Sequence, residues 1–551
     1  MFGVGGGTSS YEEVENTDLI ILWGSNARET HPIYFHRVLT GIHNGARLYV
    51  VDPRRTSSAR WADRWLGLDV GSDIALASGI GREIIDAGLA NTEFVDRATT
   101  GFEAYSRAVE PYTLKETERI TGVPAEAIRD LAHAYATAER AQLCWTLGIT
   151  EHLTGVDNVL SLINLALLTG HVGRYGSGLA PLRGQNNVQG GGDMGAIPNK
   201  YPGFQDVEDE TVVAKFERAW GTPLPRGKGW HLSQMFEAME HGTLRTAYII
   251  GENPAESEAD SAHARALLAG LDHLVVQDIF LTPTAELADV VLPAAADWCE
   301  AEGTVTNSER RVQRIRKALE PPGEAREDAA IICDLASRLG HDWGQPTAEA
   351  VWDELRALSP MHGGMSYARL EAAGGLQWPC VDEDDPGSRF LHGRLWEDEV
   401  GAPAPFSAVE WIPPGDELDE TYPIRLTTGR RLDHYNTGSQ TGGYDSPLRR
   451  REALCLCPDD AARLGLTDGQ RVLVSSRRGA VEAPVAVEAG LRPGLAFMTM
   501  HNTPEVDANI LISDQWDPKS GTAEFKATAI RIDKLEPPAA DNGEAPSLVR
   551  G

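Results

Sequence analysis

Apolar and polar positions near the start of the chain follow the order strand, loop, helix, strand. Residues 17–24 form an apolar run, residues 32–45 carry apolar side chains at helical spacing, and residues 46–51 form a second apolar run. Two parallel strands joined by a helix form a βαβ unit, so this order predicts one. Open parallel sheets bind ligands at the carboxyl ends of their strands, where Asn26 and Asp52 stand here.

The same order recurs more than 200 residues later. A strand, a helix, a strand and a further apolar run are predicted at residues 245–251, 259–271, 272–278 and 288–294. From Gly24 to Asp52 is 28 residues, and from Gly251 to Asp278 is 27. The matched spacing predicts two related α/β domains that each hold a nucleotide. Repetition of a scaffold without any ligand is the alternative.

A mainly helical stretch separates the two units and ends in a long polar loop. Residues 120–138 are amphipathic, and residues 155–173 read as a buried helix bounded by glycines. In residues 181–204 the apolar periodicity fails, and Arg183 and Gln185 stand among several amide side chains. A loop of this length inside a compact domain is typically functional, so we expect a role in a site.

The carboxyl-terminal part has the texture of a small β-barrel. Short alternating strands, broken by Gly and Asp turns, are predicted within residues 422–431, 470–487 and 494–500. Residues 346–420 are rich in Pro, Asp and Gly and are expected to connect the second unit to this barrel. The tail from residue 535 to 551 is expected to be disordered.

Composition excludes several classes of function. The chain has 551 residues and a formal net charge of −31, which disfavours nucleic acid, since phosphate binding needs clustered Lys and Arg. It contains no run of about 18 apolar residues, so we expect no membrane span. The first ten residues lack the apolar core of a signal peptide, and we expect a cytoplasmic protein.

The six cysteines do not form a metal-binding pattern. None belongs to a C-x2-C pair or lies at zinc-site spacing from a histidine. Cys455 and Cys457 are expected to be small buried residues on one face of a strand. An iron–sulfur cluster needs four thiolates at short spacings, so we expect none in this chain.

Several motifs carry a resemblance to a known family. They are GSNARETHP, VVDPRRT, the stretch from GVDNVLSLINLALLTGHVG to PLRGQNNVQGGGDMG, and VVQDIFLTPTAELADVVLPAAADWCEAEGTVTNSERRVQR. With them the sequence resembles the catalytic (alpha) subunit of molybdenum- or tungsten-dependent formate dehydrogenases, in the dimethyl-sulfoxide-reductase superfamily. The resemblance runs from residue 1 to about residue 533, and PLRGQNNVQG followed by DMG is specific to the formate dehydrogenase branch.

The resemblance implies an α/β multidomain fold. It has two pseudo-symmetric doubly wound dinucleotide-binding domains and a C-terminal six-stranded β-barrel that closes over the cofactor. The expected boundaries are 1–185 and 186–345 for the two α/β domains, 346–420 for the connecting region and 421–534 for the barrel. The implied cofactor is molybdenum or tungsten on bis(molybdopterin guanine dinucleotide).

The family's cofactor contacts can be carried over position by position. One guanine nucleotide would contact Asn26, Asp52, Arg54, Gly71 and Asp73. The other would contact Gly251, Asn253, Gln277 and Asp278. Asp and Gln suit the donor edge of guanine, and Arg54 suits a pyrophosphate. Further implied cofactor contacts are Gly148, Gln185, Arg430, His434, Asn436, Asn509, Phe525 and Lys526. His434 as an ordinary surface histidine is the alternative at that position.

Arg183 matches the arginine that lies beside the metal in the family. Its planar guanidinium can bind both formate oxygens and orient the C–H bond. The resemblance implies oxidation of formate to CO2 with hydride transfer to the metal-sulfido centre, and Gln185 between Arg183 and the pterin. A structural arginine that satisfies loop carbonyls is the alternative reading of Arg183.

The sequence departs from the family at one important point. Family members carry a four-cysteine 4Fe-4S domain and a metal-ligating Cys or selenocysteine followed by His. No residue here matches that ligand, which would lie upstream of Met1, and no iron–sulfur cluster is expected in this chain. We therefore expect an N-terminal iron–sulfur segment or subunit and NAD- or ferredoxin-linked electron-transfer subunits as partners. The alternatives are a non-catalytic cofactor-binding scaffold, an enzyme with an open metal position, and another molybdopterin oxidoreductase such as a nitrate reductase.

Overall fold

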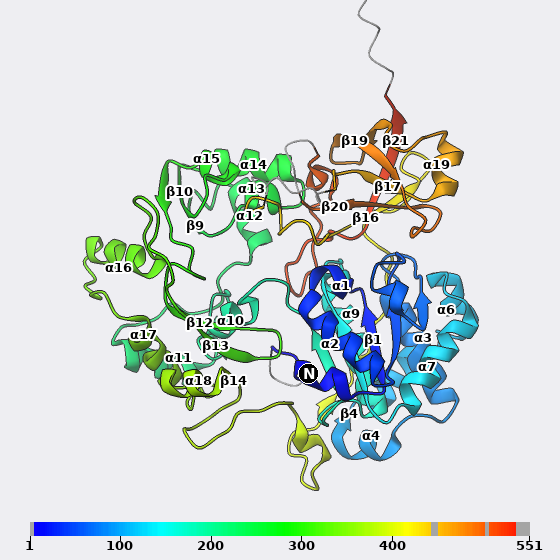
Figure 1. Ribbon diagram of the computed structural model, residues 1–551, viewed down its shortest axis with the longest axis horizontal. Coiled ribbons are helices and arrows are strands. Elements are labelled where there is room, and N and C mark those ends of the chain that lie inside the picture. The colour runs from blue at the N-terminus through cyan, green and yellow to red at the C-terminus, as the bar shows by residue number, and fades with distance from the viewer. Residues whose placement is uncertain (1–4, 442–449, 502–505, 536–551) are drawn as a thin grey trace, which may run out of the picture.

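The computed structural model describes residues 5–441, 450–501 and 506–535. Two α/β units, a small antiparallel sheet and a closed barrel make up this part of the chain (Figure 1). The mixed α/β architecture with parallel sheets and a six-stranded barrel confirms the expected fold class. The tail expected at residues 535–551 lies outside the described residues, apart from residue 535.

The first unit is built on a five-stranded parallel sheet in the order β3-β2-β1-β5-β6. Its strands are β1 (Leu19–Trp23), β2 (Arg47–Val51), β3 (Arg64–Leu66), β5 (Ala141–Trp145) and β6 (Gly178–Pro181). Every residue of β1 is buried. Parallel sheets are covered on both faces, which explains why these strands read as continuous apolar runs.

Helices cover both faces of this sheet. Ile20 and Leu22 pack with Tyr34 and Phe35 of α2 (Pro32–His43) on one face. On the other face, the helices that share a core with Leu19, Ile21 and Trp23 are α3 (Asp73–Asp86), α4 (Thr92–Ala98), α5 (Phe102–Val109), α7 (Ala125–Thr137) and α9 (Gly155–Thr169). The helices expected at residues 120–138 and 155–173 are therefore present.

The second unit has a three-stranded parallel sheet in the order β11-β10-β9. Its strands are β9 (Thr246–Ile250), β10 (His273–Asp278) and β11 (Val290–Pro293). The helices of the unit are α13 (Pro254–Ser257), α14 (Ser261–Ala269) and α15 (Pro283–Glu286). Leu274, Val276 and Ala285 form a small core between the sheet and these helices. The strands and the helix predicted for this region are confirmed.

A small antiparallel sheet links distant parts of the sequence. It joins β12 (Gly303–Thr306), β13 (Arg311–Ile315) and β14 (Leu376–Gln377). Strand β14 lies in the expected connecting region, from which β15 (Ala404–Pro405) also pairs with β4 (Thr99–Thr100) of the first unit. This region therefore packs against other layers as well as joining them.

The carboxyl-terminal strands close into the expected barrel, in the order β16-β20-β17-β19-β18-β21. They are β16 (Ile424–Gly429), β17 (Leu454–Leu456), β18 (Arg471–Ser475), β19 (Ala480–Val487), β20 (Leu495–Thr499) and β21 (Thr528–Lys534). Cys455 and Cys457 are buried, as expected. No helix in the described part of the chain combines the length and the apolar character needed to cross a bilayer.

The polar loop expected at residues 181–204 contains a short helix, α10 (Val188–Asp193). Asn187 precedes it with a left-handed φ of 68°, and three consecutive glycines lie within it. Hydrogen bonds, rather than an apolar stripe, hold helix α10 in place. Asp193 accepts hydrogen bonds from Trp378 Nε1 at 2.7 Å and from Gln189 Nε2 at 2.9 Å.

Arg310 joins the start of the chain to the small antiparallel sheet. Its guanidinium is fully buried and donates hydrogen bonds to the carbonyls of Gly7 at 2.7 Å, Ser388 at 2.9 Å and Arg389 at 2.8 Å, and also to that of Trp378. Burial lowers the pKa of Arg310 to about 10, so the side chain stays charged at neutral pH. One side chain thus satisfies backbone groups from three separate segments.

We expect Arg310→Met to destabilise the protein, because it leaves four carbonyls without their donor. An unsatisfied buried group costs about 1–3 kcal/mol, so the free energy of unfolding falls by at least ~3 kcal/mol. Differential scanning calorimetry measures the shift in the unfolding temperature. Arg316→Met is the control, because the ion pair of Arg316 with Glu371 is exposed and is worth about 0–1 kcal/mol. Equal shifts for the two variants would contradict this account.

Candidate cofactor and active site

The two α/β units share the same loop geometry after their first strands. After β1, Gly24 has a φ of 58° and donates its N–H to the Val51 carbonyl at 2.8 Å. After β9, Gly251 has a φ of 64° and donates its N–H to the Gln277 carbonyl at 2.9 Å. Both glycines adopt the left-handed backbone that residues with a Cβ disfavour. The spacing found in the sequence therefore corresponds to a real structural repeat.

The asparagines after these glycines are held in the same way. Asn26 and Asn253 are the N-caps of α1 (Ala27–Thr30) and α13. Asn26 Oδ1 accepts hydrogen bonds from the N–H of Ser58 at 3.2 Å and its Oγ at 3.0 Å. Asn253 Oδ1 accepts from the N–H of Thr284 at 3.2 Å and its Oγ1 at 2.8 Å. The repeat therefore fixes both amide groups at the carboxyl edge of a sheet.

The acidic residues after β2 and β10 also correspond, but the residues that follow them differ. Asp52 Oδ1 accepts the N–H of Arg54 at 2.9 Å, and Asp278 Oδ1 accepts the N–H of Phe280 at 3.2 Å. The guanidinium of Arg54 lies 3.6 Å from the centre of the Phe497 ring of the barrel, a cation–π contact. An arginine in the first loop is therefore replaced by an exposed phenylalanine in the second.

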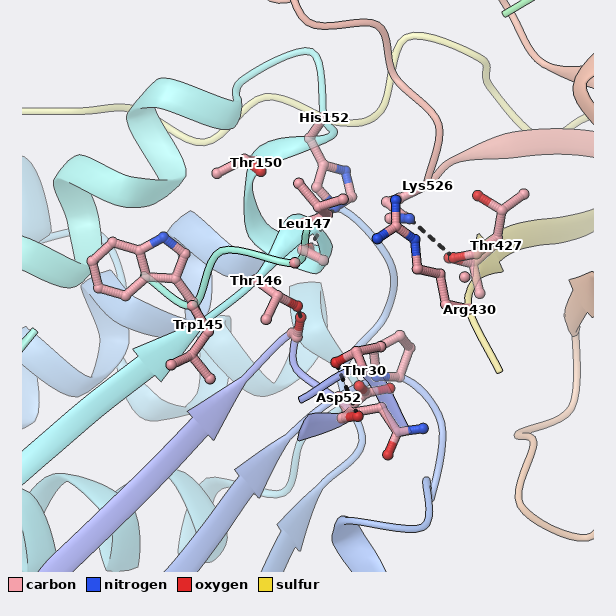
Figure 2. Close-up of a pocket in the computed structure, with 18 of the residues that line it drawn as sticks. Thr30, Asp52, Trp145, Thr146, Leu147, Thr150, His152, Thr427, Arg430 and Lys526 are labelled. Carbon is pink, nitrogen blue, oxygen red and sulfur yellow. Dashed lines mark hydrogen bonds between the residues drawn. The ribbon is translucent and has the colours of Figure 1, made fainter. Parts of the chain in front are cut away.

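A cavity of about 200 Å³ lies between the first unit and the barrel. The predicted residues that line it are Asn26, Asp52, Arg54, Gly71, Asp73, Gly148, Arg183, Gln185, Arg430 and Lys526. They come from the ends of several strands, the polar loop and the barrel. In Figure 2, Arg430 and Lys526 approach His152 from the barrel side, and Asp52 lies at the end of a strand of the first sheet.

The charges around this cavity are unevenly compensated. Lys526 Nζ pairs with Glu151 Oε2 at 2.6 Å. Arg54, Arg183 and Arg430 have no ion pair within the described residues. Burial lowers the pKa of Arg183 and of Arg430 and raises the pKa of Asp52 to about 6. The cavity therefore offers several positive groups to an anionic ligand such as a diphosphate.

Arg183 is held through its backbone N–H and carbonyl and through part of its guanidinium. Its N–H donates to Ser308 Oγ at 2.7 Å, and its carbonyl contacts His31 Nε2 at 2.7 Å. Its Nε donates to Gln189 Oε1 at 3.3 Å and its Nη2 to the Gly5 carbonyl at 3.0 Å. These acceptors are neutral, so the positive charge of Arg183 remains available to a ligand in the cavity.

A second cavity, of about 240 Å³, lies between the second unit and the barrel. Gly251, Asn253, Asp278 and Asn436 line it. Gln185 and Arg430 line both cavities, and Gln185 Nε2 donates to Asn436 Oδ1 at 2.7 Å. The two cavities therefore meet at the polar loop and the start of the barrel, one for each repeat.

Four predicted residues line neither cavity. Gln277 is fully buried and hydrogen-bonds with Tyr248 and Asp328. Asn509 Nδ2 donates to the Glu256 carbonyl at 2.8 Å and so links the barrel to α13. The His434 ring packs 5.1 Å from that of His501, and the Phe525 carbonyl accepts from Thr428 Oγ1 at 2.8 Å. The structure gives these four a supporting position around the cavities.

Sequence reasoning missed several residues that line the cavities. In the first they include Thr30, His31, Thr146, Thr150 and His152, and in the second Thr282, Tyr435, Thr437 and Ser439. Aligning the two repeats pairs Thr56 with Thr282 and Ser58 with Thr284, but Thr56 lines neither cavity, so the repeat does not mark Thr282 as a site residue. The threonines after β5 belong to no repeated motif, and no sequence signal marks them.

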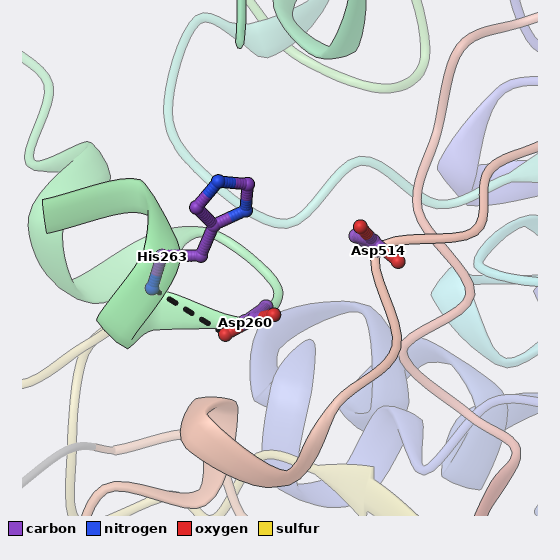
Figure 3. Close-up of side chains that lie close together, drawn as sticks. All are labelled: Asp260, His263 and Asp514. Atoms are coloured by element: carbon purple, nitrogen blue, oxygen red, sulfur yellow. Dashed lines mark hydrogen bonds between the residues drawn. The ribbon is translucent and has the colours of Figure 1, made fainter. Parts of the chain in front are cut away.

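The six cysteines and a separate triad of two aspartates and one histidine lie away from the cavities. None of the six cysteines, all of which are described, lines either cavity. Asp260, His263 and Asp514 place possible ligand atoms within 4.8 Å of one another (Figure 3). Arg478 donates a hydrogen bond to Asp514, so one of the two carboxylates is already paired. This triad is explained as a polar contact between α14 and the loop before β21.

Two family models match the chain. The model described as molybdopterin oxidoreductase matches residues 5–338, and the molydopterin dinucleotide binding domain matches residues 424–529. Subunit alpha of the F420-dependent formate dehydrogenase 2 of Methanococcus maripaludis is 41% identical over 97% of this chain and 79% of the relative. Formate dehydrogenase H of Escherichia coli is 38% identical over 97% of this chain and 75% of the relative.

A solved structure supports the fold. Acetylene hydratase from Pelobacter acetylenicus superposes with a TM-score of 0.72 over 96% of this chain and 79% of that one, at 19% identity. The arginines without an ion pair and the repeated asparagine loops are compatible with an anionic dinucleotide cofactor, in keeping with the match to the molydopterin dinucleotide binding domain. With its cavities and its matches to both family models, the chain belongs to the molybdopterin oxidoreductase family.

Proposed function

We propose that the chain is the catalytic subunit of a formate dehydrogenase, which oxidises formate to CO2, a proton and two electrons. The observation that carries the proposal is Arg183, a partly buried guanidinium beside the central cavity that forms no ion pair with a carboxylate among the described residues. A formate ion is the smallest carboxylate, and a guanidinium binds a carboxylate through two parallel hydrogen bonds. The relatives named formate dehydrogenases support the choice of substrate.

The two cavities would hold the two guanine dinucleotide arms of one cofactor. Asn26, Asp52 and Arg54 would hold one guanosine diphosphate, with Gly71 and Asp73 on the same side. Gly251, Asn253 and Asp278 would hold the other. Gln277 is also predicted to contact the second arm. Its side chain already forms hydrogen bonds with Tyr248 and Asp328, so we propose that it positions the loop. When bound, molybdenum or tungsten on this cofactor supplies the two-electron redox chemistry.

The residues between the cavities would arrange the reaction. Arg183 would bind the formate oxygens, and its contacts with Ser308, Gln189 and Gly5 fix its direction. Burial lowers the pKa of His31, so its ring is neutral and can hold the Arg183 carbonyl without adding charge. Gln185 would link the Arg183 loop to the barrel through Asn436. Fixing the carboxylate in this way leaves the C–H bond as the free end of the substrate.

We propose that another polypeptide segment or subunit supplies the protein ligand to the metal and a 4Fe-4S cluster. In support, none of the six cysteines reaches a cavity, and burial raises the pKa of Cys144 to about 12. A thiol with such a pKa is a poor metal ligand, since the thiolate is the ligand form. Electrons would then leave through NAD- or ferredoxin-linked subunits, with the protein in the cytoplasm.

The decisive experiment measures cofactor content and turnover on the same sample. The enzyme is purified from cells that naturally produce it, and metal, guanosine and formate-dependent dye reduction are determined. We expect cofactor and formate oxidation without nitrate reduction. Cofactor with no turnover of formate would favour a scaffold role, and reduction of nitrate would favour another oxidoreductase of the family.

We expect Arg183→Lys to lower kcat/KM for formate by about 100-fold or more, because lysine cannot form the two parallel hydrogen bonds that orient the carboxylate. Steady-state dye reduction by the purified holoenzyme measures the effect, and metal content shows that the cofactor is retained. Arg47→Lys, on the exposed start of β2, is the matched control and should leave the rate unchanged. A full rate in the Arg183→Lys enzyme would remove Arg183 from substrate binding.

The two asparagine loops provide a second prediction. Asn26→Leu and Asn253→Leu each disrupt one nucleotide loop, so each variant should retain about half of the guanosine found in the parent protein. Acid hydrolysis followed by chromatography of the released nucleotide measures this content. Asn44→Leu, at the exposed end of α2, is the control. If both loop variants kept the full guanosine content, the proposed division of the cofactor between the cavities would be wrong.

A further inference from the structure

A fully buried histidine, His501, follows β20 at the point where the barrel meets both cavities. Strands β16 and β20 pair in parallel, and Arg430 and Met500, the residues that come directly after them, line both cavities. A buried imidazole needs hydrogen-bond partners, because an unsatisfied polar group costs free energy away from water. The partners of its two ring nitrogens therefore determine which segments His501 joins.

The hydrogen bonds of His501 determine where its proton lies. The N–H of Arg431 donates to Nε2 at 2.8 Å, so this nitrogen carries no hydrogen. Nδ1 lies 2.6 Å from the carbonyl oxygen of Asn436 and is therefore the donor. Burial lowers the pKa of His501 to about 4, which leaves the ring neutral at physiological pH. His501 thus connects the end of β16 to the following loop through one acceptor and one donor.

The Arg431 side of this connection is anchored in the barrel. The Arg431 guanidinium pairs with Glu452 Oε1 at 2.8 Å, and both side chains are buried. Glu452 also accepts a hydrogen bond from Thr499, the last residue of β20. Separating a buried ion pair is strongly unfavourable, so these groups resist rearrangement. The backbone donor to His501 is therefore held in place by the barrel itself.

Asn436, on the other side of His501, has a strained backbone. Its φ of 49° lies in the left-handed region, which is unfavourable for a residue with a Cβ. In this conformation Asn436 Oδ1 accepts a hydrogen bond from Gln185 Nε2 at 2.7 Å. Asn436 lines the second cavity and Gln185 lines both. The bond from His501 to the Asn436 carbonyl therefore supports a strained residue that ties the barrel to the polar loop.

The polar loop connects this support to Arg183. Gln185 lies two residues after Arg183 and shortly before α10. Arg183 Nε donates to Gln189 Oε1 of the same helix at 3.3 Å, so the guanidinium follows the position of the loop. A misplacement of about 1 Å in a site can lower a rate about 100-fold. The position of Asn436 therefore affects how Arg183 is presented to the central cavity.

We propose that His501 is a positioning residue for Arg183. It holds Asn436 in the conformation that pairs with Gln185, and in this way it fixes the polar loop relative to the barrel. It does so without contacting the substrate. The expected effect on formate turnover rests on the proposed function, whereas the expected effect on the polar loop does not.

Two substitutions of His501 separate positioning from packing. His501→Leu loses both hydrogen bonds, whereas the amide of His501→Gln can accept the Arg431 N–H and donate to the Asn436 carbonyl. Hydrogen–deuterium exchange of the full protein, purified from the cells that produce it, is measured by mass spectrometry. We expect exchange in residues 183–193 to rise about fivefold or more in His501→Leu and to stay near the parent rate in His501→Gln. Exchange in β17 and β19 should not change in either variant.

A double variant tests the order of the contacts. Asn436→Leu alone should raise exchange in residues 183–193 as His501→Leu does, and combining the two should add nothing further, because both remove the same connection. His171→Leu is the matched control. His171 is also buried, its pKa is also lowered to about 4, and its Nε2 contacts the Tyr135 carbonyl at 2.8 Å in the first unit. This variant should leave exchange in residues 183–193 unchanged.

Formate-dependent dye reduction provides the second readout. We expect kcat/KM to fall about tenfold or more in His501→Leu at unchanged guanosine content, and to recover to at least about half of the parent value in His501→Gln. A parent protein that does not oxidise formate would refute the proposed function, and the exchange rates would still decide the role of His501. Unchanged exchange in residues 183–193, an equal rise in β17 and β19, an additive double variant or no recovery with glutamine would each overturn the proposal.

Discussion

The close approach of two glycines forms the base of the central cavity. A Cβ on Gly24 would lie 2.8 Å from the carbonyl carbon of Gly148, and a Cβ on Gly148 would lie 2.5 Å from the Gly24 oxygen. Thr146 Oγ1 also donates to this oxygen at 2.7 Å. The loops after β1 and β5 can therefore meet only if neither residue carries a side chain. Every group that these two loops bring to the cavity depends on that contact.

The same constraint explains why the two cavities differ although their loops repeat. In the first unit β5 supplies a second loop opposite Gly24, which encloses the cavity with Thr146 and Gly148. In the second unit no described strand occupies the corresponding edge of β9, and a Cβ on Gly251 would meet no atom within 4 Å. The second cavity is instead closed by barrel residues such as Tyr435 and Thr437. Both units contain the asparagine loop, but the wall opposite this loop comes from β5 in the first unit and from the barrel in the second.

Much of the fold follows from the sequence because buried parallel strands leave continuous apolar runs. Residues 17–24 and 46–51 are typical examples, and the glycine-to-acid spacing located the repeat. Ten predicted site residues line the first cavity. Asn26 and Asp52 are predicted because the carboxyl ends of parallel strands converge at one edge, and the others rest on the polar loop or on the family resemblance. Gln277 shows where this reasoning fails. It ends an apolar run as Asp278 does, but the alternation along a strand turns its side chain to the opposite face of the sheet.

The charge of the whole chain and the charge of the cavity act over different distances. A formal charge of −31 opposes the approach of any anion, yet charges separated by more than about 8 Å are largely screened at physiological salt. The lining of the cavity combines Arg54, Arg183 and Arg430, which have no ion pair within the described residues, with the carboxyl groups of Asp52 and Asp73. Burial raises the pKa of both carboxyls, which weakens the negative contribution further. The local field in the cavity therefore favours anions, although the net charge of the whole protein disfavours them.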